Sequence, residues 1–130
     1  MKQTLPTPSA PKALGPYSHM VQAGDWIYLS GQIPIDPATG EIVEGGIQAQ
    51  TQRVLDTIEA LLSDVGLSTD HIVKTTIYIT NMADFGAINA LYAERFRAPY
   101  PARATVEVAG LPKGVGIEID AVIHRAGRAE

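Results

Sequence analysis

The sequence of 130 residues contains no cysteine, and this absence excludes several kinds of chemistry. Without a thiol the chain can form no disulfide, supplies no thiolate nucleophile and binds no metal through cysteine. Its three histidines, His19, His71 and His124, do not have the spacing of metal ligands. We therefore expect neither a disulfide framework nor a metal site.

Positive charge is also scarce in this sequence. The chain has 10 basic and 14 acidic residues, and the basic residues are scattered from Lys2 to Arg128 without a dense run. Binding to a nucleic-acid backbone requires a positive field, which this balance does not supply. The composition therefore predicts no nucleic-acid partner.

Long apolar runs and the common nucleotide-binding motifs are missing as well. No segment has the ~18 consecutive apolar residues of a membrane-spanning helix. Prolines interrupt the N-terminal stretch, where a secretory peptide needs a continuous apolar run. The GxSxG pattern of serine hydrolases and the glycine-rich phosphate-binding patterns are also absent. We expect a soluble, cytoplasmic protein without a membrane partner.

The residues that are present favour a globular fold. Hydrophobic residues make up 45% of the chain and charged residues 18%, a balance in which apolar burial can offset the loss of chain entropy. A chain of this length has too little apolar surface for two cores. We therefore expect one domain that spans residues 1–130.

Turn residues and periodicity predict the first half of the fold. Residues 1–14 contain three prolines and predict a surface arm before the first strand. Two apolar runs, HMVQA and WIYLS, flank Gly24-Asp25 and predict a β-hairpin. A helix follows and ends before Gly66, where a left-handed residue is favoured. Its apolar stripe consists of Ile47, Val54, Leu55, Ile58, Leu61, Leu62 and Val65.

The second half of the chain repeats this pattern. Residues 71–80 alternate as in a strand, and Asp84 fits the N-cap of a second helix. The apolar side of that helix consists of Phe85, Ile88, Leu91, Tyr92 and Phe96. Two last strands, RATVEVAG and GIEIDAVIH, are expected to form a hairpin through LPKGV.

The element order, strand, strand, helix, strand, helix, strand, strand, is typical of an α+β fold. It predicts a two-layer arrangement in which both helices pack on one face of a mixed sheet. No third layer remains for the other face. That face is expected to meet either water or another subunit.

Polar residues alternate with apolar ones in the last two strands. In a hairpin, Arg103, Thr105, Glu118 and Asp120 would share the face opposite the helices, so that a cation and two carboxylates converge. An ordinary solvated strand face explains the same alternation. The stiff entry through Pro101 favours a fixed guanidinium that binds a carboxylate in two places.

Asn89 is an unusual residue on the apolar side of the second helix. It projects within roughly 20° of Phe96 and roughly 40° of Phe85 at the helical angle per residue. A buried amide needs hydrogen-bond partners. Either a bond from the helix to a loop or a contact with a ligand would supply them.

The C-terminal third of the chain resembles a known family. Pro101-Ala102-Arg103, then Val106, Ala109 and Leu111, and then Ile117-Glu118-Ile119 resemble the signature of the RidA/YjgF deaminases. The resemblance extends over nearly the whole chain. Its other matching segments are Gly15-Pro16-Tyr17-Ser18, Ser30-Gly31-Gln32-Ile33-Pro34, residues 72–76, and Asn89 with Tyr92.

This resemblance implies a fold, an assembly and an activity. Members of the family have a chorismate-mutase-like α+β fold and form homotrimers with three sites in clefts between subunits. They hydrolyse reactive 2-imino acids and their enamine forms to 2-oxo acids and ammonia, with no metal or organic cofactor. We therefore expect a small-molecule imine as the substrate.

The resemblance also implies roles for individual residues. Arg103 would bind the substrate carboxylate, aided by the backbone amide of Gly31, and Glu118 would orient and deprotonate the attacking water. The residues expected to line or fix the cleft are Tyr17, Ser30, Asn89 and Thr105. Thr105 stands where many members have cysteine, so we expect an altered substrate preference rather than lost activity.

Two other functions compete with this one. A non-catalytic binding or regulatory module would capture 2-oxo acids or other carboxylates with Arg103 and would not need Glu118. A ribonuclease or translation inhibitor, a function attached to some relatives, is disfavoured by the acidic balance and by the lack of a histidine pair.

Overall fold

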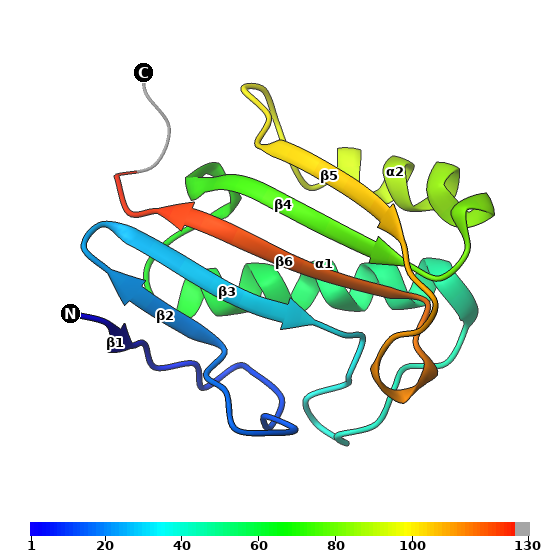
Figure 1. The fold of residues 1–130 in the computed structure, drawn as a ribbon, viewed down its shortest axis with the longest axis horizontal. Helices are drawn as coiled ribbons and strands as arrows, with labels where there is room; N and C mark the ends of the chain where they lie inside the picture. The colour runs from blue at the N-terminus through cyan, green and yellow to red at the C-terminus, as the bar shows by residue number, and fades with distance from the viewer. Residues whose placement is uncertain (127–130) are drawn as a thin grey trace.

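A computed structural model describes residues 1–126 of the chain. It contains one mixed six-stranded sheet in the order β1-β2-β3-β6-β4-β5, with both helices on one face (Figure 1). The elements are β1 Gln3–Thr4, β2 Met20–Ala23, β3 Trp26–Gln32, α1 Gly46–Asp64, β4 Ile72–Ile79, α2 Phe85–Ala93, β5 Ala102–Glu107 and β6 Ile117–His124. Three short 3-10 turns lie at Thr69–His71, Met82–Asp84 and Pro112–Gly114. The predicted two-layer α+β fold is confirmed.

The longer helix, α1, forms where the apolar stripe predicted it. Its buried side chains include Val54, Leu55, Ile58 and Leu61, at the spacing that places them on one side of a helix. The chain leaves the helix through Gly66, whose φ of 76° lies in the left-handed region that favours glycine. This face packs on the sheet and closes the main core.

The sheet supplies the other half of that core. Every second residue of β6 is buried, and the matching residues of β3 and β4 are buried with them. The fully buried apolar side chains of the three strands are Ile27, Ile77, Ile79, Ile117, Ile119 and Ile123. The three central strands are therefore fixed by burial, which holds the residues on their opposite face in place.

The predicted hairpin of the last two strands is wrong. β5 pairs with β4 in parallel, while β6 runs antiparallel between β3 and β4. The segment LPKGV therefore connects two strands that are separated by β4. It contains a 3-10 turn, Pro112–Gly114, in place of a tight hairpin turn.

The prediction that the polar residues of these strands share one face is wrong for the same reason. Arg103 and Thr105 are in register with Thr75 and Ile77, which are buried under the helices. Residues in register on neighbouring strands point to the same side. Glu118 pairs with Tyr78, whose side chain lies on the opposite, open face. Arg103 and Glu118 thus project from opposite faces of the sheet.

The start of the chain and the start of α2 also differ from expectation. The N-terminal arm is not purely a surface arm, because β1 adds a strand next to β2 and Leu5 is buried in the core. Asp84 makes no side-chain cap for α2. Asn81 caps the preceding 3-10 turn in its place, accepting a hydrogen bond from the amide of Ala83.

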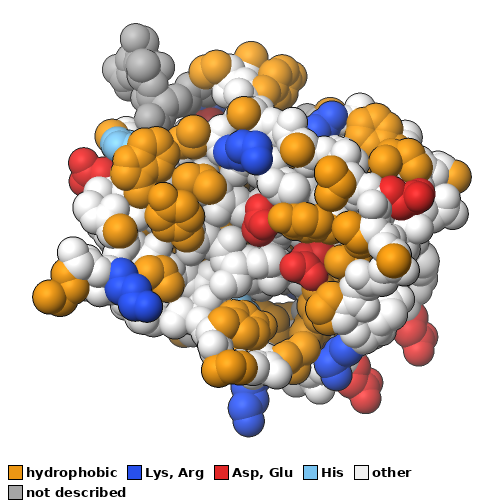
Figure 2. All heavy atoms as spheres, in the orientation of Figure 1, with side chains coloured by type: hydrophobic (Ala, Val, Ile, Leu, Met, Phe, Trp, Pro, Cys, Tyr) orange, Lys and Arg blue, Asp and Glu red, His pale blue; other side chains and the backbone are white. Residues whose placement is uncertain are grey.

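The open face of the sheet carries exposed apolar side chains. Trp26 and Tyr28 of β3 and Val106 of β5 are each about two-fifths to one-half exposed. Figure 2 shows this face, with apolar side chains spread over the sheet and acidic side chains near its centre. Within residues 1–126, no helix is long and apolar enough to cross a membrane.

Candidate functional site

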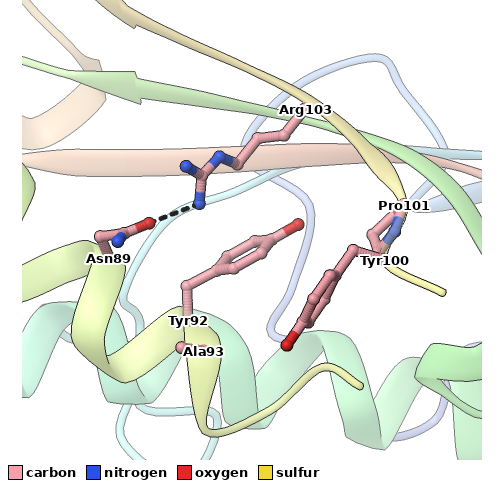
Figure 3. A pocket seen from close by; sticks show the side chains of 6 residues that line it. All are labelled: Asn89, Tyr92, Ala93, Tyr100, Pro101 and Arg103. Atoms are coloured by element: carbon pink, nitrogen blue, oxygen red, sulfur yellow. Dashed lines mark hydrogen bonds between the residues drawn. The ribbon is translucent and has the colours of Figure 1, made fainter. Parts of the chain in front are cut away.

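A pocket of about 400 Å³ lies between the start of β5 and the helix α2 (Figure 3). We call it the arginine pocket. Its lining residues are Asn89, Tyr92, Ala93, Tyr100, Pro101 and Arg103. It combines one cation, one amide and two aromatic rings at the edge of the sheet.

The guanidinium group of Arg103 is held from two sides. It donates a hydrogen bond of 2.8 Å to Oδ1 of Asn89, and its central carbon lies 4.9 Å from the ring centre of Tyr92 and 5.6 Å from that of Phe85. A cation over aromatic faces is attracted by the π electrons. Asn89 and the two rings therefore fix the direction of the fork, as Figure 3 shows for Asn89 and Tyr92.

Tyr92 is itself fixed. Its hydroxyl shares a hydrogen bond of 2.8 Å with the hydroxyl of Thr75, and its ring stacks on Phe96 with the centroids 4.2 Å apart. Burial raises the pKa of the Tyr92 hydroxyl, so the neutral form is favoured. The ring beneath Arg103 is thus a rigid, uncharged support.

Arg103 also lacks a carboxylate partner among the described residues 1–126. Among residues 1–126 the ion pairs of arginine involve Arg95, with Asp56 and Glu59, and Arg97, with Asp70. A guanidinium carries five N–H donors, and Asn89 takes one from Arg103. The remaining donors are available to an anionic ligand.

A second pocket, of about 450 Å³, opens on the other side of the sheet. We call it the glutamate pocket. Its lining residues are Leu14, Tyr17, Ser30, Gly31, Ile33, Pro112 and Glu118. Figure 2 shows a hollow in the open face toward the side where the N-terminal segment lies in Figure 1.

A β-bulge shapes this second pocket. The register of β3 against β6 shifts between Leu29 and Gln32, so that β3 has one more residue than its partner over this stretch. Ser30 and Gly31 occupy the bulge. The hydroxyl of Ser30 donates a hydrogen bond of 2.6 Å to the carbonyl of Ser18, which ties the N-terminal segment to the strand.

Glu118 approaches the backbone of Gly31 closely. A Cβ atom built on Gly31 would lie 1.9 Å from Oε2 of Glu118 and 2.7 Å from its Cδ. Any side chain at this position would therefore displace the carboxylate. The bulge and the glycine together leave room for the Glu118 side chain to lie over the strand.

The carboxylate of Glu118 is in an environment that favours its protonated form. Partial burial raises the pKa of Glu118, and the nearby charge of Asp120 raises it further. Asp120 is held by a hydrogen bond of 2.9 Å from the hydroxyl of Tyr78. A carboxylate whose pKa is raised toward neutrality is suited to accept a proton from water.

The residues predicted for the site are thus divided between two pockets. Arg103 and Asn89 line the arginine pocket. Asn89 is half-buried rather than buried, and its hydrogen-bond partner is Arg103 on β5, neither the loop nor the ligand that was expected. Four other predicted site residues line the glutamate pocket: Tyr17, Ser30, Gly31 and Glu118. Thr105 lines neither pocket, and its hydroxyl is buried without a hydrogen-bond partner among residues 1–126.

Several lining residues were not expected from the sequence. Tyr92 was predicted on the apolar side of the helix, and no role was predicted for Tyr100. Phe85 does not line the pocket, but its ring contacts Arg103, which was not expected. The spacing of Phe85, Asn89 and Tyr92, four and then three residues apart on one helix face, was a usable signal. No group of three or more His, Asp or Glu side chains gathers as metal ligands in residues 1–126.

Comparison with known proteins identifies the family. The family model described as Endoribonuclease L-PSP matches residues 7–125. The solved structure of RidA from an Antarctic Psychrobacter species has 40% sequence identity and a TM-score of 0.89, over 94% of this chain and 98% of that one. The chain belongs to the RidA/YjgF family. The resemblance found in the sequence is confirmed.

Two further members of the RidA/YjgF family carry names that bear on ligands. A mouse protein named 2-iminobutanoate/2-iminopropanoate deaminase is 38% identical over 122 residues, which cover 94% of this chain and 90% of the mouse protein. Escherichia coli TdcF, solved with bound serine, is 41% identical with a TM-score of 0.88, over 95% of this chain and 98% of that one.

Proposed function

We propose that this RidA-family protein hydrolyses reactive 2-imino acids and their enamine tautomers to 2-oxo acids and ammonia. The observation that carries the proposal is the fixed guanidinium of Arg103, which lines a pocket without a carboxylate partner among the described residues. A 2-imino acid has a carboxylate next to its C=N bond. The deaminase name of the mouse relative and the amino acid bound to TdcF support this class of ligand.

In the proposed reaction, binding is the task of the arginine pocket. Arg103 holds the substrate carboxylate through paired charge-assisted hydrogen bonds, and the backbone amide of Gly31, which lies in the glutamate pocket, assists. Two bonds to one carboxylate fix its plane as well as its position. The imine carbon beside the carboxylate is thereby oriented for attack.

The chemical step is the task of the glutamate pocket. Glu118 accepts a proton from a water molecule while the water oxygen bonds to the imine carbon, and the imine nitrogen gains a proton. Glu118 then returns its proton to the nitrogen of the resulting carbinolamine, whose hydroxyl loses a proton to solvent as the carbon–nitrogen bond breaks and ammonia leaves. One water is consumed, and one 2-oxo acid and one ammonia are released, without a redox step or a cofactor.

The two pockets open on opposite sides of one chain, so the proposal includes an assembly. We propose a homotrimer in which the arginine pocket of one subunit meets the glutamate pocket of its neighbour. Each chain then contributes to two of three equivalent sites. Trimer contacts would also cover the exposed apolar side chains of the open face, such as Trp26 and Tyr28.

Thr105 is assigned an indirect role in this proposal. It follows Arg103 on the same side of β5, and its hydroxyl is buried. Threonine has a branched β-carbon where many family members carry the straight side chain of cysteine. We propose that this residue changes the preference among imine side chains without abolishing the reaction.

A coupled assay tests the proposed activity. An amino-acid oxidase or a pyridoxal-phosphate lyase generates the imine, and the release of 2-oxo acid and of ammonia is followed with and without the purified protein. We expect the protein to accelerate both releases equally. Unchanged rates over a range of imine side chains would reject the enzymatic function.

A non-catalytic carboxylate-binding module is the second candidate. The observation that favours it is that the arginine pocket is complete in one chain without Glu118. Calorimetry with a 2-oxo acid distinguishes the two functions when it is combined with the coupled assay. Binding that survives Glu118→Ala, in a protein that does not hydrolyse imines, would favour the module.

A further inference from the structure

One wall of the glutamate pocket comes from a segment without regular structure. Residues 11–18, here called the arm loop, lie between β1 and β2 and contain neither helix nor strand. Leu14 and Tyr17 of this loop line the pocket, and both are exposed in the chain. A wall built from such a segment needs an anchor, because an unanchored loop samples many conformations.

The imidazole ring of His19 supplies that anchor. Its Nε2 lies 2.7 Å from the carbonyl oxygen of Pro11, at the start of the arm loop. Its Nδ1 lies 3.1 Å from Nε2 of Gln32, which also donates a hydrogen bond of 3.0 Å to the carbonyl of Ser30. The ring therefore connects the beginning of the loop to β3 beneath the pocket.

These partners determine how the ring is protonated. A carbonyl oxygen only accepts hydrogen bonds, so the Pro11 contact requires a proton on Nε2 of His19. The amide nitrogen of Gln32 is already oriented as a donor by the carbonyl of Ser30, so Nδ1 must accept. The contacts thus fit the neutral imidazole with its proton on Nε2.

The anchor is buried at one end and reaches the pocket at the other. Gln32 is 2% exposed, so its bonds are shielded from competing water. The ring of Tyr17 packs edge to face against the His19 ring, with centroids 5.6 Å apart. The backbone of His19 is fixed too, because its carbonyl accepts a hydrogen bond of 2.9 Å from the amide of Ser30.

We propose that His19 is a positioning residue of the glutamate pocket, which closes the arm loop and holds Tyr17 and Leu14 against the substrate. His19 does not line the pocket itself and acts through the loop. The part of the inference that concerns substrate rests on the proposed function. The part that concerns the loop does not, so the two can be tested separately.

The test uses His19→Phe, which keeps a ring beside Tyr17 but removes both hydrogen bonds. His19→Gln is the conservative variant, because its amide can still donate to the carbonyl of Pro11. His124→Phe is the matched control. That histidine packs on Trp26 at the far end of β3 and has no contact with the arm loop.

The first measurement is limited proteolysis with trypsin at Lys12, an exposed residue of the arm loop. We expect His19→Phe to be cleaved after Lys12 on the order of tenfold faster than the unmodified protein, because it loses two hydrogen bonds that each correspond to a factor of roughly two to ten. His124→Phe should be cleaved at the unmodified rate and His19→Gln at a rate between the two. Equal cleavage of His19→Phe and the unmodified protein would overturn the proposal, whatever the activity.

The second measurement is the kinetics of imine hydrolysis. A loosened wall weakens substrate binding, so we expect KM of His19→Phe to rise on the order of tenfold while kcat changes less than about twofold. A fall in kcat with unchanged KM would overturn the positioning role. If the unmodified protein does not hydrolyse imines, the proposed function fails, and the proteolysis result still decides whether His19 anchors the loop.

A second variant covers the case in which His19→Phe does not fold. Gln32→Met removes the donor to Nδ1 of His19 and leaves the Pro11 contact in place. We expect the same faster cleavage after Lys12, by a smaller factor. Cleavage at the unmodified rate in folded Gln32→Met would count against the anchor.

Discussion

The two pockets hold their central charged groups in opposite ways. In the arginine pocket, the guanidinium of Arg103 is bonded to Asn89 and supported by Tyr92, which is locked by Thr75. In the glutamate pocket, the carboxylate of Glu118 has no hydrogen-bond partner among residues 1–126 and is repelled by a neighbouring carboxylate. The neighbours of Arg103 stabilise its charged form, whereas the surroundings of Glu118 destabilise its charged form.

This contrast suits two different tasks. A group that only binds a ligand works best when it is rigid and fully charged before the ligand arrives. No side-chain entropy is then lost on binding, so the binding free energy is not reduced by that cost. A group that must accept a proton gains from an environment that makes its ionised form less favourable. The contrast therefore agrees with the proposed division, in which Arg103 binds the substrate and Glu118 takes part in the chemical step.

The largest effect is expected from removing the binding charge. Arg103→Ala leaves the substrate carboxylate in the pocket without a cation, so we expect kcat/KM for imine hydrolysis to fall about a hundredfold or more. The coupled assay measures the fall. Thermal unfolding should change little, because the side chain is exposed at the edge of the sheet.

Arg53→Ala is the control for this variant. Arg53 lies on α1, and its Nε donates to Thr57 within the same helix. Its removal should leave kcat/KM unchanged. Full activity of Arg103→Ala would remove the basis of the proposed function.

The next effect concerns the assembly that joins the two pockets. Arg103→Ala and Glu118→Gln are each expected to be nearly inactive alone. If the pockets meet between subunits, random reassembly of an equal mixture restores both charges in one of every four interfaces, so about one quarter of the activity should return. The experiment is unfolding and refolding of the mixed variants, followed by the coupled assay.

Separately refolded variants, mixed afterwards, are the control for subunit exchange. No recovery in the co-refolded mixture would place both charges of a site in the same chain and contradict the assembly. Sizing in solution adds an independent check, because a monomer cannot form the proposed cleft.

Local sequence signals predicted the parts of the fold that depend on local interactions. The stripe of α1 with Gly66 after it, and the hairpin around Gly24, involve residues close in sequence. The neighbours of β6 depend instead on pairing with β3 and β4, which are distant in sequence. A turn-like segment such as LPKGV does not determine which strands pair.

Alternation had a related weakness in the candidate site. It separates the two sides of a strand, but it does not say which side faces the helices. On β6 the apolar side faces the helices. On the edge strand β5 the polar side, with Arg103, faces α2, and Val106 lies on the open face. Arg103 and Glu118 were predicted as site residues from their residue types and the family resemblance, whereas their separation on opposite faces could be seen only from the strand order.

A smaller effect is expected from a side chain at position 31. Gly31→Ala places a methyl group where Oε2 of Glu118 lies, and the flexible end of that glutamate can move away. We expect little loss of stability but a fall in kcat on the order of tenfold to a hundredfold, because the proton acceptor is displaced. Gly86→Ala, with open space around its Cβ, is the control. Unchanged kcat in Gly31→Ala would separate Glu118 from the chemistry.

The smallest effect is a pH-dependent gain in stability from Glu118→Gln. The pKa of Glu118 is raised in the folded protein, so the folded state favours the protonated carboxyl. The free energy of unfolding therefore falls as the pH rises through the pKa of the folded state and Glu118 becomes charged. Glutamine avoids the loss. Unfolding temperatures should be equal near pH 4 and higher for Glu118→Gln by roughly a few °C near pH 7, since solvent screens a partly exposed group.

The exposed Glu41→Gln, in the loop before α1, is the control for a change of charge alone. A higher unfolding temperature in Glu118→Gln but not in Glu41→Gln, together with lost activity, would mean that the ionisable group in the glutamate pocket lowers the stability of the fold and is needed for activity. That result would sharpen the contrast with Arg103, whose charge is stabilised by its neighbours. Lower stability of Glu118→Gln at pH 7 would mean that folding favours the charged carboxylate, and the contrast would fail.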